Sequence, residues 1–436
     1  MKEDILQFLW KHRRFNHACL TTIQGEKIEI LSPGLHNPNS GPDFLNARIR
    51  INNTEWAGHV EIHVHGSDWK KHGHASDSAY DNVILHVVYF HDEQAYNGSM
   101  QPLPTLELMG KVNPYDLERC DTLLEKDNDV PCFPEAKPIT TVYKRAAMER
   151  ALVQRLEERS TYIQASLEKH GQDWEQLTFE TIARSFGFGV NNICFEETAK
   201  SIKINTVHRI AAEPFQAEAL LFGQAGLLPV KSVHGYPQLL IREYKHLQHA
   251  HGLFPLQLDW KFARTHPQNF PTLRMAQLAA VLFHVKNLFS TLKETEKITD
   301  VINLFIQPVS DYWKNHFSFT GNVQTNRINQ SLGEKSAQGI VINAVVPLLF
   351  TYARINKAEA LEEKTLRWLT ELPPEHNTIT RKYVGEADFP NVSAGDSQGI
   401  LQLYKHACLR KKCLNCQVGH QLLGKAEEPV VGYEVM

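Results

Sequence analysis

Residues 56–65 read Trp-Ala-Gly-His-Val-Glu-Ile-His-Val-His and alternate between apolar and polar side chains. A period of two is typical of a β-strand, in which successive side chains point to opposite faces of a sheet. The apolar side chains expected on one face are Val60, Ile62 and Val64. The polar side chains expected on the other are His59, Glu61, His63 and His65. Such a polar face makes a poor core but a good metal site, because carboxylate oxygens and imidazole nitrogens can converge on one ion.

The segments around this strand predict a small mixed α/β domain. Residues 4–14 have the apolar spacing of a helix, and residues 83–90 are apolar almost throughout, as in a central strand. The other expected strands are 27–31, 44–51 and 105–109. From about residue 140 the pattern is helical, as in the amphipathic spacing of Leu152, Leu156, Ile163 and Leu167, and helical signals recur to about residue 370.

The fold class expected from these patterns is therefore α+β. The expected parts are a mixed-sheet α/β domain at 1–125, a mostly α-helical domain at 139–400 and a cysteine-cluster segment at 401–426, followed by a loose tail from about Glu427. The acidic, proline-bearing stretch 125–138 marks the first boundary.

Asp43 stands directly before the strand expected at 44–51. If that strand forms a hairpin with 56–65, Asp43 would lie close to Glu61 or His63. The candidate metal ligands are therefore Asp43, Glu61, His63 and, on the same strand face, His65. The alternative is a solvated face with surface histidines. Taken singly, a structural role or a hydrogen bond beside the site is favoured for His59, His65, His72, His74 and His86.

The order helix, strand, strand preceded by Pro42-Asp43, strand with Glu61-Ile62-His63, helix and strand resembles the restriction-endonuclease-like PD-(D/E)XK superfamily over about residues 1–110. The resemblance implies that Asp43 and Glu61 hold Mg²⁺ or Mn²⁺. His63 replaces the usual lysine, so it could act as a general base, or ligate the metal and favour Mn²⁺, Fe²⁺ or Zn²⁺, or mark a lost activity. The expected function is a divalent-metal-dependent phosphodiesterase, a nuclease, with catalytic Asp43, Glu61 and His63.

Two other functions are compatible with the same residues. One is a nucleic-acid-binding protein without catalysis on a degenerate nuclease fold. The other is a metal-dependent hydrolase of a small substrate. Fold resemblance alone does not choose among them, because function depends on the site.

Over its length the chain also resembles an uncharacterised bacterial family, domain of unknown function 2851. The resemblance implies kinship and no known activity. The segments that carry it are Gly41-Pro-Asp-Phe44, Gly58-His-Val-Glu-Ile-His63, Ser67-Asp-Trp69 with His72 and His74, Asn82-Val-Ile-Leu-His86, Pro267-Gln-Asn-Phe-Pro271, and Cys413-Leu-Asn-Cys416 with Gly419.

A second candidate metal site lies near the C-terminus. Cys408, Cys413, Cys416 and His420 follow the spacing C-x4-C-x2-C-x3-H, which could close a tetrahedral zinc site. Three cysteines also suit an iron–sulfur cluster with its fourth ligand elsewhere, for which Cys132 is a candidate. The alternative is a set of buried thiols without a metal.

Composition and net charge narrow the expected cellular compartment and the expected classes of binding partner. The seven cysteines are an odd number, and the acidic start of the chain is unlike a secretory signal, so a reducing, cytoplasmic location is expected. The apolar run 340–353 contains Asn343 and Pro347 and predicts a buried helix rather than a membrane span. A net charge of −3 leaves nucleic acid as a partner only through a local basic patch. No pattern indicates an oligomeric state.

Overall fold

The computed structural model describes residues 1–37, 39–126, 128–210, 213–230, 235–263, 266–319 and 330–424. By its contacts the chain divides into two compact units. The first unit comprises residues 1–148, 381–390 and 401–436, and the second comprises 149–380 and 391–400. Residues 401–424 thus group with the N-terminal domain, which the sequence analysis treated as separate. The predicted tail from Glu427, with residues 425 and 426 before it, lies outside the described residues.

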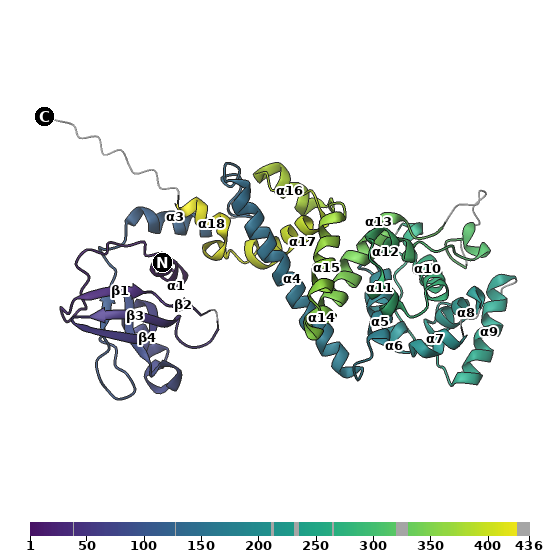
Figure 1. Cartoon of the computed structure of the whole chain (residues 1–436), viewed down its shortest axis with the longest axis horizontal. Helices are drawn as coiled ribbons and strands as arrows, with labels where there is room; N and C mark the ends of the chain where they lie inside the picture. The colour runs from purple at the N-terminus through teal and green to yellow at the C-terminus, as the bar shows by residue number, and fades with distance from the viewer. Residues whose placement is uncertain are drawn as a thin grey trace. The chain divides into compact units, whose positions relative to one another are not determined.

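The first unit contains a mixed sheet in which β3 runs antiparallel to β1 and β4, whereas β4, β5 and β6 are parallel to one another (Figure 1). The strand order is β1-β3-β4-β5-β6, and β2 pairs with β3. The strands are β1 (Ile28–Ser32), β2 (Leu35–His36), β3 (Phe44–Ile51), β4 (Thr54–His65), β5 (Val83–Phe90) and β6 (Thr105–Glu107). The predicted α+β class with a mixed N-terminal sheet is confirmed.

The turn between β3 and β4 has only two residues, Asn52 and Asn53. Asn52 has a φ of 51°, a left-handed conformation that asparagine tolerates better than most residues. The tight turn lets β4 begin at Thr54, two residues before the predicted start. The hairpin also fixes the register, with Phe44 opposite Val60.

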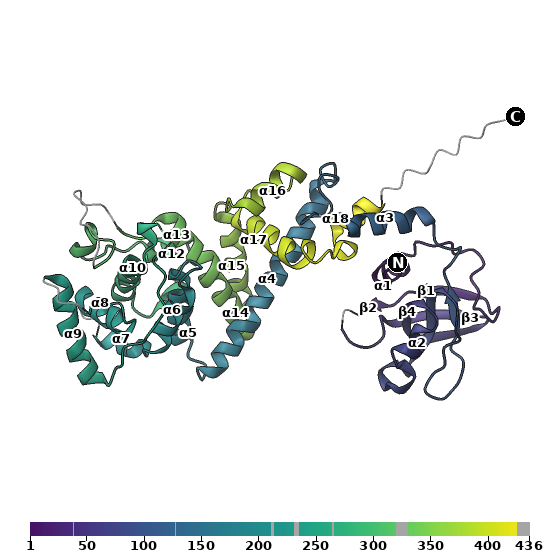
Figure 2. The ribbon, with the colours of Figure 1, turned by 180° about the vertical axis from the view of Figure 1, so that it is seen from behind.

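The second half of β4 is buried on both faces. Val60 and Ile62 are covered on one side, and Glu61 and His63 on the other. Helices α1 (Glu3–Lys11) and α2 (Asp68–Lys71) both contact β4, and Figure 2 shows them beside the sheet. The sequence predicted a longer first helix, to residue 14, but Arg13 adopts a φ of 52°, which ends the helix.

The remaining helices of the first unit are α3 (Pro114–Glu125), α18 (Gln417–Gly424) and parts of three helices that contain the unit boundaries. These three are α4 (Thr141–Lys169), α16 (Thr378–Ala387) and α17 (Ala394–Leu403). Residues Tyr404–Cys408 continue α17 as a π-helical turn, η6, and Cys413–Asn415 form a short 3-10 turn, η7.

The second unit is helical in its described part. Its helices are α5 (Trp174–Phe186), α6 (Asn192–Lys200), α7 (Ile204–Ile210), α8 (Pro214–Gln224), α9 (Tyr236–His251), α10 (Pro271–His284), α11 (Leu288–Glu294), α12 (Ile298–Phe305), α13 (Glu334–Ile340), α14 (Val346–Asn356) and α15 (Glu359–Glu371). One apolar core, with large buried side chains such as Phe222, Trp313 and Trp368, holds them together. Helical structure extends past residue 370, where the sequence signals fade.

The apolar run predicted as a buried helix lies in this core. The continuous helical stretch Glu334–Asn356 is long and apolar enough to cross a membrane, but 72% of its most apolar window is buried inside the protein. That degree of burial is typical of the core helix of a soluble protein, so the stretch is weak evidence for a membrane span.

Candidate metal centre

Asp43 and Glu61 meet where β3 stops pairing with β4. The backbone N–H of Asp43 donates to Oε2 of Glu61 at 2.9 Å, and the backbone N–H of Ile62 donates to Oδ2 of Asp43 at 3.0 Å. Because β3 begins only at Phe44, no residue of that strand pairs with Ile62, and the carboxylate of Asp43 accepts its N–H instead. Oδ1 of Asp43 accepts a third hydrogen bond from the Gln7 side chain of α1 at 2.8 Å. These contacts hold Glu61 by its oxygen Oε2, and its other oxygen, Oε1, points away from Asp43 toward a group of histidines.

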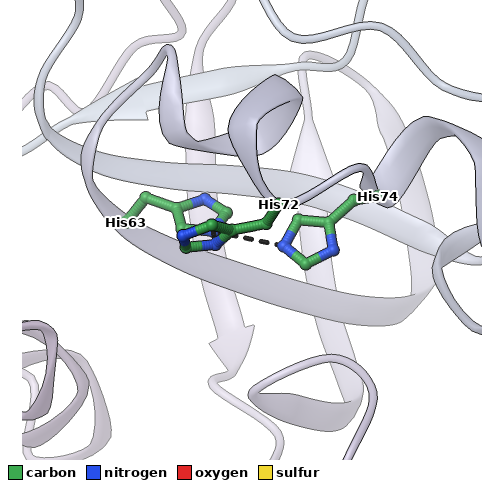
Figure 3. Close-up of side chains that lie close together, drawn as sticks. All are labelled: His63, His72 and His74. Atoms are coloured by element: carbon green, nitrogen blue, oxygen red, sulfur yellow. Dashed lines mark hydrogen bonds between the residues drawn. The ribbon is translucent and has the colours of Figure 1, made fainter.

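Oε1 of Glu61 faces a group of three imidazoles. It lies 3.6 Å from Nε2 of His63 and 3.4 Å from Nε2 of His74. Nε2 of His63 is 3.1 Å from Nδ1 of His72 and 3.3 Å from Nε2 of His74. The three rings come from β4, from the end of α2 and from the start of η1 (His74–Ser76), and Figure 3 shows them gathered on one point.

One ring nitrogen from each histidine lies within 4.8 Å of the other two. In metal sites with imidazole ligands, bonds of about 2.0–2.1 Å put neighbouring donor atoms about 3.3 Å apart. The separations from Nε2 of His63 match that spacing. A single N–H at Nε2 of His63 cannot donate a good hydrogen bond to both neighbouring rings at once. Lone pairs from all three rings, in contrast, can converge on one cation. The arrangement therefore fits a transition-metal ion, for which imidazole is a preferred ligand.

Burial keeps the imidazoles of His63 and His74 in their neutral, metal-binding form. The pKa of His63 is held far below its usual range, first by burial and then by the neighbouring rings of His86, His74 and His72. Burial also lowers the pKa of His74 to about 4, with a further contribution from His72. In the carboxylate pair, burial raises the pKa of both Glu61 and Asp43, and the charge of Asp43 raises that of Glu61 further. Each raised pKa makes protonation easier near neutral pH.

A family model described as "Protein of unknown function (DUF2851)" matches residues 3–378, which include the whole of this centre. The chain belongs to the DUF2851 family. No curated protein and no solved structure matches it.

From the sequence, only a structural or hydrogen-bonding role was expected for two of these three imidazoles, His72 and His74. His72 and His74 follow the end of β4, and only the reversal of the chain through α2 brings them back over His63. A signal was present, since the segment Ser67-Asp-Trp69 with His72 and His74 carried part of the family resemblance. His86, also expected to support a site, bonds Nδ1 of His63 through its Nε2 at 2.8 Å.

His65, the fourth predicted ligand of this site, is not brought to the centre. Its side chain is exposed beyond the last buried residues of β4, and its ring packs edge-on against Phe90. His59 lies near the other end, where its Nδ1 accepts the backbone N–H of Asn46 at 3.3 Å. The strand face is therefore divided, with only Glu61 and His63 facing the centre.

The C-terminal candidate residues separate into two groups. Cys408, Cys413 and Cys416 lie in and after η6, outside the residues that the DUF2851 model matches. His420 instead directs Nε2 to the carbonyl oxygen of Leu414 at 2.5 Å, and its ring packs against His12 of the N-terminal segment. The structure thus places the histidine nitrogen on a backbone carbonyl.

Proposed function

We propose that this DUF2851 protein is a metal-dependent hydrolase of phosphodiester bonds, with nucleic acid as its substrate class. His63, His72 and His74 would hold a divalent transition-metal ion, and Glu61 would act beside it. The observation that carries the proposal is the convergence of the three ring nitrogens, with Oε1 of Glu61 3.4 and 3.6 Å from two of them.

Three imidazole ligands leave coordination positions for water and substrate, as in other catalytic metal sites. A divalent ion bound there would polarise a phosphate and make coordinated water more acidic. Glu61 is placed to accept the proton released, because its Oε1 borders the ligand atoms while its Oε2 is fixed by the backbone of Asp43. Asp43 in this proposal positions Glu61. Its own oxygens already accept hydrogen bonds from Gln7 and Ile62, so it differs from the metal ligand expected from the sequence.

The choice of phosphodiesters is supported by the order of elements. α1, β1, β3, β4, α2 and β5 follow the order on which the resemblance to PD-(D/E)XK nucleases rested. Asp43 precedes β3, and Glu61-Ile62-His63 lies on β4, as in that resemblance. The donor set changes the expected ion, because three imidazoles favour Zn²⁺ or Fe²⁺ over the predicted Mg²⁺ or Mn²⁺.

Restricted access to the centre favours a second candidate, the hydrolysis of a small phosphodiester or related ester. His63 and His74 are buried, and His72 alone among the three rings is exposed. A substrate would therefore approach from the side of His72, where a small molecule meets less obstruction than a duplex.

The test begins with the metal content of the full-length protein and of His63→Ala, His74→Ala and Glu61→Gln. His65→Ala is the matched control, because it removes an imidazole from the same strand but outside the centre. We expect the two centre variants to lose the metal. Glu61→Gln should keep the metal and hydrolyse at least about 10²-fold more slowly, the usual effect of removing a general base.

Hydrolysis is measured with single- and double-stranded DNA and RNA and with bis(p-nitrophenyl) phosphate, in Zn²⁺, Mn²⁺, Fe²⁺ or Mg²⁺. Cleavage of nucleic acid that His65→Ala keeps and the centre variants lose would support the proposal, and cleavage of the small ester alone would favour the second candidate. Folded, metal-loaded protein that cleaves none of these substrates would refute both. Activity that persists in Glu61→Gln would remove the assigned role of that residue.

A further inference from the structure

We propose that the first unit binds an iron–sulfur cluster through four cysteines, which are Cys132, Cys408, Cys413 and Cys416. This site is separate from the histidine centre and does not depend on the proposed function. It brings Cys132 together with three closely spaced cysteines that follow much later in the sequence.

The three C-terminal cysteines are presented by an irregular backbone. Cys408 ends the π-helical turn η6, and π-turns within helices often mark functional sites. Lys411 then adopts a φ of 51°, which reverses the chain toward η7. Cys413 opens η7, and the backbone N–H of Cys416 donates to the carbonyl oxygen of Cys413 at 3.1 Å. A compact turn therefore carries two thiols, with Cys408 just before it.

The segment that contains Cys132 meets the C-terminal cysteines through the side chain of Tyr383. The hydroxyl of Tyr383 donates to Sγ of Cys408 at 2.9 Å, and its ring packs edge-on against Phe133, with 5.0 Å between ring centroids. Tyr404 of η6 also donates to Oδ2 of Asp129 at 3.4 Å. The segment around Cys132 thus lies against both Tyr383 and η6.

Three of the four cysteine side chains are shielded from solvent, as ligands of a buried cluster would be. Cys132, Cys408 and Cys413 are each less than a tenth exposed. Burial raises the pKa of Cys132, and the thiols of Cys408, Cys416 and Cys413 raise it further. Burial raises the pKa of Cys408 and of Cys413 to about 12, and Cys416 contributes in both cases. Such thiols stay protonated and unreactive without a cation, whereas a bound metal stabilises the thiolates.

The spacing favours iron and sulfide over zinc. Structural zinc sites usually combine two pairs of closely spaced ligands. Here three cysteines follow C-x4-C-x2-C and one is remote, as in ferredoxin-type sets that bind iron–sulfur clusters. The hydroxyl of Tyr383 on Sγ of Cys408 is a further feature of such sites, since hydrogen bonds to ligand sulfurs adjust the reduction potential.

The test is anaerobic purification of the full-length protein, with measurement of iron, zinc and acid-labile sulfide and of visible absorption. Serine variants of Cys132 and Cys416 are compared with Cys120→Ser, a buried cysteine of the same unit that is not part of this set. We expect iron and sulfide together in the wild type and in Cys120→Ser, and their loss in the other two variants. Zinc without sulfide would overturn the cluster, as would the absence of any metal after reconstitution with iron and sulfide.

A second variant keeps the proposal testable if the serine variants fail to fold. Tyr383→Phe removes one hydrogen bond and leaves all four cysteines. We expect it to retain iron and sulfide but to lower the reduction potential of the cluster, because the hydrogen bond stabilises the more negative reduced state. An unchanged potential in an iron-loaded Tyr383→Phe protein would contradict the assignment of Cys408 as a cluster ligand.

Discussion

Nδ1 of His63 lies 2.8 Å from Nε2 of His86, and the pair is buried between β4 and β5. The other nitrogen of His63, Nε2, faces His72 and His74. The other nitrogen of His86, Nδ1, has no hydrogen-bond partner among the described residues. If His63 donates through Nδ1, its Nε2 carries a lone pair toward His72 and His74. His86 would then set the tautomer that a metal requires.

His86→Leu removes the acceptor for His63 and should weaken metal binding about 10- to 100-fold, the usual effect of losing a group that orients a ligand. His86→Gln should lose less, because its amide oxygen can accept the same hydrogen bond. Affinity is measured by competition with a chromophoric chelator. Equal affinities of His86→Leu and wild type would exclude this orienting role.

Gly419→Ala should disturb the cysteine turn. A Cβ at this position of α18 would collide with the carbonyl oxygen of Cys413. Among the described residues, a Cβ at Gly424 in the same helix would meet only the Arg14 side chain, at 3.8 Å. We therefore expect Gly419→Ala to lose metal or stability and Gly424→Ala to resemble the wild type. The readouts are metal content and thermal unfolding. Wild-type behaviour of Gly419→Ala in both would show that the close approach at Cys413 is not required.

Glu218 gives the second unit a stability that depends on pH. It is almost fully buried, and it accepts hydrogen bonds from Trp313 at 2.8 Å and Tyr236 at 2.9 Å. Burial raises its pKa to about 7, so the folded state favours the protonated form. The stabilisation is complete below the unfolded pKa and is lost as pH rises through the folded pKa.

Glu218→Gln stays neutral at every pH and keeps an acceptor oxygen. Between pH 5 and 8 the wild type should lose up to about 3 kcal/mol that the variant does not lose, because burial raises the pKa of Glu218 from 4.5 to about 7. The measurement is denaturant unfolding across that range. Glu213→Gln, exposed at the start of the same helix, should follow the wild type. Parallel pH curves for Glu218→Gln and wild type would count against the raised pKa.

Lys364 is buried and caps a helix end with its ammonium group. Its Nζ donates to the carbonyl oxygens of Lys293 at 2.6 Å and Thr295 at 3.1 Å. Lys364→Met should lower the free energy of unfolding by about 1–3 kcal/mol, because it leaves those carbonyls without a donor. Glu296 pairs with the same ammonium group but is largely exposed, so Glu296→Ala should cost less than about 1 kcal/mol. If Lys364→Met and Glu296→Ala lost equal free energies of unfolding in chemical denaturation, the ion pair with Glu296, rather than the hydrogen bonds to the backbone, would account for the stabilisation by Lys364.

Local patterns predicted the sheet well. The strands at 44–51 and 83–90 have their predicted bounds, because alternating or continuous apolar residues set strand length directly. The hairpin also brings Asp43 to Glu61, as two adjacent strands must when their turn is short. These features depend on neighbours in the sequence.

The parts that the sequence did not predict depend on the direction of the chain after a strand ends. The positions of His72 and His74 are set by how α2 and η1 turn back over β4, and no spacing rule gives that direction. Cys132 was named as a candidate fourth ligand, but no spacing supported it, because the approach of its segment to η6 depends on the packing of Phe133 on Tyr383. The spacing of apolar residues along the chain does not predict contacts between segments that are distant in the sequence.

The first unit is built from both ends of the chain, and this has a consequence for synthesis. About 250 residues separate its N-terminal part from residues 401–424, and at about 5–20 residues per second a ribosome needs tens of seconds to make them. During that interval the nascent sheet exists without η6, η7 and α18. A message cut short before Tyr404 would yield a chain that lacks these elements, so the first unit cannot be completed until translation has passed residue 424.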